Sequence, residues 1–110
     1  VWWVLVHEDR LFSCAREGSV RVWDLETSAT LAVISPHKMG SVRSITIHRD
    51  RLYTASDDCT LRSSTLSGQL LGTFLGHSGA VTSVTTDGTS VYTGSADYTI
   101  RKWTTEASPI

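Results

Sequence analysis

The sequence has few of the residues that indicate a disulfide-bonded, metal-binding or membrane-spanning protein. Its 110 residues include two Cys, two Pro and one Met, and no apolar run approaches the length of a transmembrane helix. Cys14 and Cys59 form no Cys-x-x-Cys pair, and no Cys/His cluster has the spacing of zinc ligands. We therefore expect two free thiols in a reducing, intracellular compartment (cytoplasm or nucleus), no cofactor or metal, and no membrane contact.

An excess of charge is also lacking. Ten basic residues face eleven acidic ones, which gives a net charge of −1. Such a balance provides no overall field to hold nucleic acid or an anionic membrane. Nucleic acid is therefore not an expected partner.

What the sequence does contain is a repeat with a period near 40 residues. Leu11, Leu52 and Val91 correspond in an ungapped self-alignment and lie 41 and then 39 residues apart. The same two offsets relate Trp23, Ser64 and Trp103. Self-similarity at a fixed period of this length is typical of a repeat architecture.

Each period contains short runs rich in Val, Ile, Thr and aromatic residues, separated by Asp, Gly and Ser, which predicts strands and tight turns without helices. The expected strands are 1–6, 10–15, 19–24 and 30–35; then 41–47, 51–56, 60–64 and 69–75; then 80–86, 90–95 and 99–104. The last period stops before a fourth strand.

Two short motifs make the repeat resemble a known family. Gly76-His77 lies early in a period and Trp23-Asp24 lies late, and each copy has Asp or Glu six residues before the Trp position. The chain thus resembles the WD40 family, whose four-stranded antiparallel blades form β-propellers. The resemblance implies an all-β fold of about three blades from a larger propeller, a fragment divided at 1–40, 41–79 and 80–110, with the third blade lacking its outer strand.

The resemblance also implies a structural hydrogen-bonded tetrad of His, Ser or Thr, Asp and Trp in each blade. The third repeat supplies all four members, and the other two supply some of them. The expected members are His77, Thr93, Asp97 and Trp103; His37, Thr54 and Asp58, with Ser64 at the Trp position; and Ser13, Glu17 and Trp23. A hydroxyl, a His and an Asp also make up catalytic triads, but no exposed nucleophile or oxyanion hole is indicated here, so we expect no enzyme activity.

The function that the resemblance implies is a non-catalytic scaffold that binds proteins or peptides within a complex. Two alternatives stay open: a targeting domain of a multidomain enzyme, such as a ubiquitin ligase substrate receptor or a kinase whose catalytic part lies elsewhere, and a purely structural set of blades in a large assembly. The rest of its own propeller, or further copies, would be needed to close the ring.

Partner contact is expected on the propeller face that WD40 relatives commonly use. The positions on that face are Trp2, Arg43 and Thr82, just after the first-strand Val, and Arg16, Asp57 and Ala96, just before the turn acid. Arg16 and Arg43 resemble the arginines with which F-box-type WD40 receptors hold phosphorylated peptides. A guanidinium group donates paired hydrogen bonds to phosphate or carboxylate, so our hypothesis is an acidic or phosphorylated ligand, with Asp57 placed to neutralise Arg43.

Overall fold

The computed structural model describes residues 3–14, 16, 18–36 and 40–103, and these form strands joined by turns, without helices. The strands are β1 (Trp3–His7), β2 (Arg10–Cys14), β3 (Val20–Asp24), β4 (Thr30–Ile34), β5 (Val42–His48), β6 (Arg51–Ser56), β7 (Leu61–Thr65), β8 (Leu70–Phe74), β9 (Val81–Thr86), β10 (Val91–Ser95) and β11 (Ile100–Trp103). Each lies within a residue or two of an expected strand.

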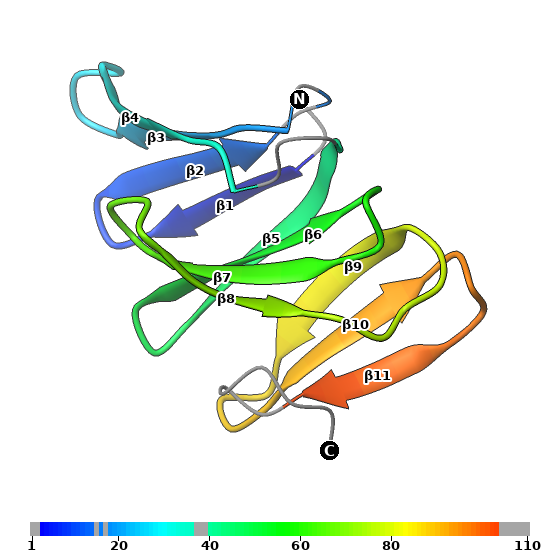
Figure 1. The fold of residues 1–110 in the computed structure, drawn as a ribbon. Coiled ribbons are helices and arrows are strands. Elements are labelled where there is room, and N and C mark those ends of the chain that lie inside the picture. The colour runs from blue at the N-terminus through cyan, green and yellow to red at the C-terminus, as the bar shows by residue number, and fades with distance from the viewer. Residues whose placement is uncertain (1–2, 15, 17, 37–39, 104–110) are drawn as a thin grey trace.

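Three antiparallel sheets stack side by side along the chain (Figure 1). The first sheet has the order β1-β2-β3-β4, the second β5-β6-β7-β8, and the third β9-β10-β11 within the described residues. Each sheet pairs strands that follow one another in sequence, so every connection within a sheet is a hairpin. The all-β class and the blade-like sheets are confirmed. The proposed blade boundaries at residues 40 and 79 stay a prediction.

Alternating side chains explain why the sheets stack face to face. Leu52 and Tyr53 are neighbours on β6 and both are fully buried, but they belong to different clusters. Leu52 packs with Phe12 of the first sheet, and Tyr53 packs with Val84 of the third sheet. Because successive side chains of a strand point to opposite faces, the second sheet is apolar on both faces and fills two cores.

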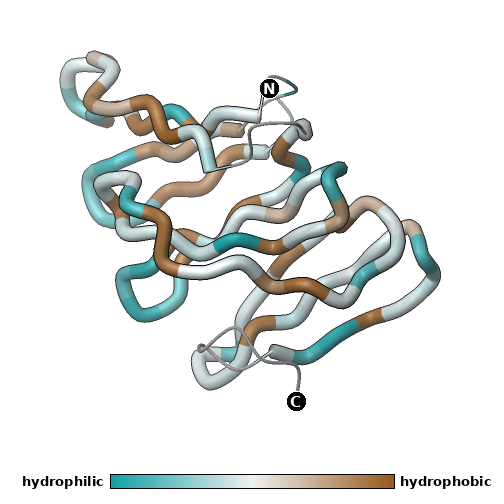
Figure 2. Tube along the Cα trace, in the orientation of Figure 1, coloured by the Kyte–Doolittle hydropathy of each residue, from teal (hydrophilic) through white to brown (hydrophobic). Residues whose placement is uncertain are grey.

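The turns carry most of the polar character. In Figure 2 the turns between β1 and β2 and between β5 and β6 are hydrophilic, while hydrophilic and hydrophobic residues alternate along the strands.

One turn position recurs in all three sheets with a positive φ: Gly18 at 82°, Cys59 at 72° and Tyr98 at 69°. Glycine adopts this conformation without strain, whereas Cys and Tyr do not. The second and third repeats therefore hold this turn with a residue that disfavours it.

Candidate functional site: a buried polar tetrad and an exposed turn face

A chain of hydrogen bonds links four side chains of the third repeat. The indole Nε1 of Trp103 donates to Thr93 Oγ1 at 2.8 Å, Thr93 Oγ1 lies 2.7 Å from His77 Nε2, and His77 Nδ1 lies 2.9 Å from Asp97 Oδ2. Because the Asp97 carboxylate is only an acceptor, His77 carries its proton on Nδ1 and donates it to Asp97. The unprotonated Nε2 then accepts the hydrogen of the Thr93 hydroxyl.

Asp97 anchors this chain at the turn between β10 and β11. Its Oδ2 also accepts from the Ser78 amide at 2.9 Å, and its Oδ1 accepts from the Thr99 amide at 2.9 Å and from the Thr99 hydroxyl. The Thr99 hydroxyl, the His77 ring and these two amides hold the pKa of Asp97 well below its usual range. The carboxylate is therefore charged at neutral pH and ties the segment before β9 to the turn after β10.

Gly79 allows this close approach. A Cβ added at Gly79 would lie 2.9 Å from the backbone nitrogen of Asp97 and 3.2 Å from the carbonyl carbon of Ala96. Both atoms belong to the backbone, so neither can rotate away. The Gly-His segment and the Asp turn can pack this closely only because residue 79 has no side chain.

The tetrad residues are placed for a structural role and not for attack on a substrate. Thr93 and Trp103 are 1% and 0% exposed, and His77 is also buried. The Thr93 oxygen already accepts the indole hydrogen, while a nucleophile must be accessible and free to lose its proton to a base. The set shares its residue types with a catalytic triad, but its hydroxyl is closed off from solvent.

The other two repeats contain partial versions of the same contact. In the first sheet Trp23 Nε1 donates to Ser13 Oγ at 3.0 Å, and Trp23 is half-buried. The expected fourth member of the first repeat, Glu17, lies outside the described residues, as does His37 of the second repeat.

In the second sheet the Thr54 hydroxyl donates to the Arg62 carbonyl at 3.4 Å, and Asp58 Oδ1 accepts from the Thr60 amide at 2.9 Å. Ser64 takes the place of the Trp and is 1% exposed. Its Oγ has no hydrogen-bond partner among the described residues.

The positions expected to face a partner lie at the turns that follow β2, β6 and β10 and at the starts of β5 and β9. Arg16, Arg43, Thr82 and Ala96 are exposed, Asp57 is half-exposed, and Trp2 lies outside the described residues. Within the second sheet, Arg43 Nε lies 2.7 Å from Asp57 Oδ1 and Nη2 lies 3.4 Å from Oδ2. The two expected partner-binding residues of this sheet therefore form an ion pair.

A hydrogen bond from Ser41 links the first repeat to the second at this same face. The Ser41 hydroxyl donates to the Arg16 carbonyl at 2.6 Å, and the Asp57 amide donates to the Ser41 carbonyl at 3.0 Å. In the third sheet the Thr82 hydroxyl donates to the Gly94 carbonyl at 3.3 Å. These bonds hold the turns that carry Arg16 and Asp57 close to the start of β5.

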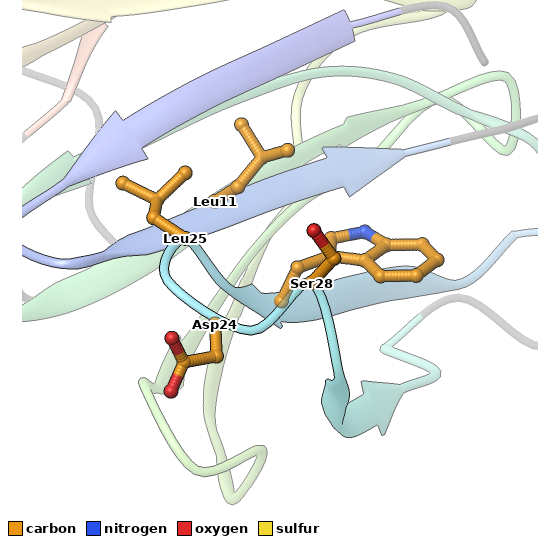
Figure 3. Close-up of a pocket in the computed structure, with 5 residues that line it drawn as sticks. Leu11, Asp24, Leu25 and Ser28 are labelled. Carbon is orange, nitrogen blue, oxygen red and sulfur yellow. The ribbon is translucent and has the colours of Figure 1, made fainter.

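A small cavity that the repeat pattern did not indicate lies at the far end of the first sheet. It has a volume of about 190 Å³ and is lined by Leu11, Trp23, Asp24, Leu25 and Ser28. Figure 3 shows Leu11 on β2 and Leu25, Ser28 and Asp24 around the turn between β3 and β4. Asp24 Oδ1 accepts from the Glu26 amide at 2.8 Å and shapes this turn. The only sequence signal for this cavity was the Trp-Asp motif itself.

The remaining polar groups define no further reactive centre in the described ranges. No three His, Cys, Asp or Glu side chains gather there into a group that could hold a metal ion. Cys14 and Cys59 are both unpaired thiols, and burial raises the pKa of Cys14 to about 11, which keeps it protonated and unreactive. In the same part of the chain no helix has the length and apolar character needed to cross a membrane.

Stacked four-stranded sheets, a period near 40 and the His-Thr-Asp-Trp tetrad define a class of protein, the repeats that form propeller blades. Comparison with known families gives the assignment: residues 28–63 and 68–104 match the WD40 family, described as "WD domain, G-beta repeat". These two segments cover more than half of the chain. The chain belongs to the WD40 family, whose members are generally non-catalytic interaction domains.

Two related proteins are much longer than the segment that matches this chain. It is 34% identical over 76 residues to Transducin beta-like protein 3 of Bos taurus, an alignment that covers 64% of this chain and 10% of that protein. It is 33% identical over 76 residues to Nuclear distribution protein PAC1 of Saccharomyces cerevisiae, covering 68% of this chain and 15% of that protein. The matched segment is thus a small part of either relative.

Solved structures agree on the fold. The computationally designed Ika4 protein superposes with a TM-score of 0.80 at 24% identity over 92% of this chain and 63% of that chain. The designed Ika8 protein gives the same TM-score and identity, and the alignment covers 32% of that chain. At this level of identity the likeness concerns the fold alone.

Proposed function

We propose that this chain is a non-catalytic protein-interaction module whose turn face, formed by the segments around Arg16, Arg43 and Asp57, binds an acidic or phosphorylated segment of a partner protein. The family supports the general role, since WD40 domains generally bind other proteins. The single observation that carries the finer proposal is the ion pair between Arg43 and Asp57. It holds one guanidinium in place on an exposed face, beside the turn that carries the exposed Arg16.

The ion pair between Arg43 and Asp57 affects how strongly the face can bind an anion. The Arg43 and Asp57 side chains are 44% and 32% exposed, so water screens their attraction and an incoming phosphate can compete for the guanidinium. A planar guanidinium fork suits phosphate and carboxylate alike. Asp57 repels any such anion, and we therefore propose that it limits the affinity of the face for acidic ligands.

The test is a peptide display in which each sequence is present in a neutral, an acidic and a phosphorylated form. The display is probed with the intact protein. We expect acidic and phosphorylated peptides to be retained selectively, and Arg16→Glu and Arg43→Glu each to weaken retention at least tenfold. Asp57→Asn should strengthen it. The matched control is Arg49→Glu in the turn between β5 and β6, at the opposite end of the sheet, which should change nothing.

Two results would contradict the proposal. Equal retention of neutral and phosphorylated peptides would show that the ligand need not be acidic. Losses below about threefold for both arginine variants would remove Arg16 and Arg43 from the contact surface.

We also propose a cytoplasmic or nuclear location, which the two unpaired thiols support. Fluorescence microscopy of the tagged full-length protein tests it.

A further inference from the structure

One histidine lies buried in the contact between the second and third sheets. His48, at the end of β5, is 3% exposed, and its Nδ1 lies 2.8 Å from the hydroxyl oxygen of Thr86, at the end of β9. A second bond joins the same two sheets, from the Val84 amide to Ser44 Oγ at 3.3 Å. The same two sheets also share an apolar cluster that includes Tyr53, Phe74 and Trp103.

The bonds around Thr86 fix the protonation of the ring. The Thr86 hydroxyl donates its hydrogen to the Ser90 carbonyl at 2.9 Å and accepts from the Gly88 amide at 3.1 Å. Its oxygen can then only accept from His48, so His48 Nδ1 carries the hydrogen. In the neutral ring Nε2 is therefore unprotonated, and in the described part of the chain it is buried without a hydrogen-bond partner.

We propose that His48 makes the contact between the second and third sheets sensitive to pH, so that protonation of the ring loosens the two sheets. A proton added at Nε2 would place a charged donor in a buried site that offers it no acceptor. Burying an unpaired charge or donor is unfavourable. The contact is therefore most stable with neutral His48 and weakens when the ring becomes charged.

The surroundings of the ring support this direction. The groups around it are Arg49 in the following turn, Arg51 and Tyr53 on β6, and Asp87 in the turn after β9. Burial, and secondly the positive charge of Arg49, hold the pKa of His48 below its usual 6.5, while Asp87 acts in the opposite direction. Tyr53 presents its ring to His48 edge-on at 6.2 Å between centroids and supplies no compensating charge.

Asp87 does not serve as the missing acceptor, because His48 Nε2 has no hydrogen-bond partner among the described residues. Its Oδ1 accepts from the amides of Thr89 and Ser90 at 2.8 Å each, and its Oδ2 accepts from the Tyr92 hydroxyl at 2.9 Å. These bonds hold the carboxylate within its own turn. In this arrangement the carboxylate forms no hydrogen bond with the His48 ring.

The first and second sheets provide a natural comparison at the same repeat position. His7 ends β1 as His48 ends β5, but its side chain is 29% exposed, and its Nε2 lies 3.6 Å from Asp50 Oδ1 and 3.9 Å from Glu8 Oε1. His7 Nε2 is also buried without a hydrogen-bond partner among the described residues, but two carboxylates lie within 4 Å of it. His7 is therefore the matched control, a histidine at the same repeat position with acidic neighbours.

The sign of the pH effect follows from linkage. Since the folded pKa of His48 is lowered, the unfolded chain binds the proton more readily, and stability is complete above the unfolded value of about 6.5 and falls below it. One proton changes the unfolding equilibrium by at most tenfold per pH unit. Between pH 7.5 and 5.5 we expect His48 to raise the unfolding constant, by at most about tenfold.

The test compares urea unfolding of the intact protein at pH 7.5, 6.5 and 5.5 for the wild type, His48→Asn and His7→Asn. An asparagine amide can donate to Thr86 as Nδ1 does, but it does not titrate in this range. We expect His48→Asn to remove this increase in the unfolding constant, and His7→Asn to retain it. Equal pH dependence in the wild type and His48→Asn would overturn the proposal.

A direct titration keeps the proposal testable if His48→Asn does not fold. Imidazole NMR signals of the wild-type protein, followed from pH 8 to 5, give the protonation of each ring, and the His7→Asn spectrum helps to assign them. We expect the His48 signal to remain that of the neutral ring with Nδ1 protonated below pH 6.5. A His48 ring that becomes charged at or above pH 6.5 would refute the proposal.

Discussion

Replacing Thr93 by Val removes one hydroxyl from the centre of the buried tetrad while keeping the size of the side chain. The indole of Trp103 loses its acceptor at 2.8 Å, and His77 Nε2 loses its donor at 2.7 Å. Trp103 is 0% exposed and His77 is 7% exposed, so water has little access to either group. Each unsatisfied buried group costs about 1–3 kcal/mol, and the expected loss is roughly 2–5 kcal/mol for the pair.

A loss of this size is a large part of the stability of a small domain, which is typically about 5–15 kcal/mol. Urea unfolding followed by tryptophan fluorescence measures it. Thr93→Ser is the matched control, because it keeps the hydroxyl and removes one methyl group, with an expected loss of about 1 kcal/mol. Ser13→Ala provides a second comparison in the first sheet, where Trp23 is half-buried and water can replace the lost acceptor.

Two results would contradict the expected role of the Thr93 hydroxyl. If Thr93→Val and Thr93→Ser unfold with free energies that agree within about 0.5 kcal/mol, the hydroxyl makes no net contribution and the tetrad is not a stabilising unit. A loss in Ser13→Ala as large as that in Thr93→Val would show that burial of the indole does not determine the effect.

Three further predictions concern the turn that holds Asp97. Gly79→Ala should lower stability by about 1–3 kcal/mol, measured by urea unfolding, because its Cβ would lie 2.9 Å from the Asp97 nitrogen. Tyr98→Gly should raise the thermal midpoint by about 2–6 °C, because Tyr98 is 100% exposed and has a φ of 69°; no gain would argue against strain there. The hydrogen bonds from Thr99, His77 and Ser78 lower the pKa of Asp97, so its stabilising charge is complete above 3.8 and is lost as the pH falls further. Asp97→Asn should therefore flatten the decline in stability below pH 4.

Much of the fold follows from local sequence. The strands were predictable because alternation of apolar residues and turn signals such as Ser67-Gly68 and Asp87-Gly88 depend only on neighbouring residues. The contact of Trp103 with Thr93 could be anticipated from the resemblance to WD40 repeats. Arg43 and Asp57 could likewise be placed on one face, since both positions are fixed by the same period.

The contacts between sheets could not be predicted from the sequence of single repeats. The bond between His48 and Thr86 joins residues 38 apart and depends on how two sheets pack against each other. The cavity beside Trp23 depends on the path of the turn that carries Leu25 and Ser28. The complete burial of Ser64 depends on how its neighbours fill the space that a Trp takes elsewhere. Repeat position does not determine any of these.

The two separate apolar clusters have a consequence for how the molecule opens. The second sheet contributes to both clusters, through Leu52 on one face and Tyr53 on the other, whereas the first and third sheets each contribute to one. Energetic coupling is then between nearest neighbours, as in a one-dimensional array. Among these three sheets, the first or the third can separate from the second without opening the other core, but the amides of β6 become accessible only when both cores have opened. Of the three, the second sheet should therefore show the highest protection against exchange.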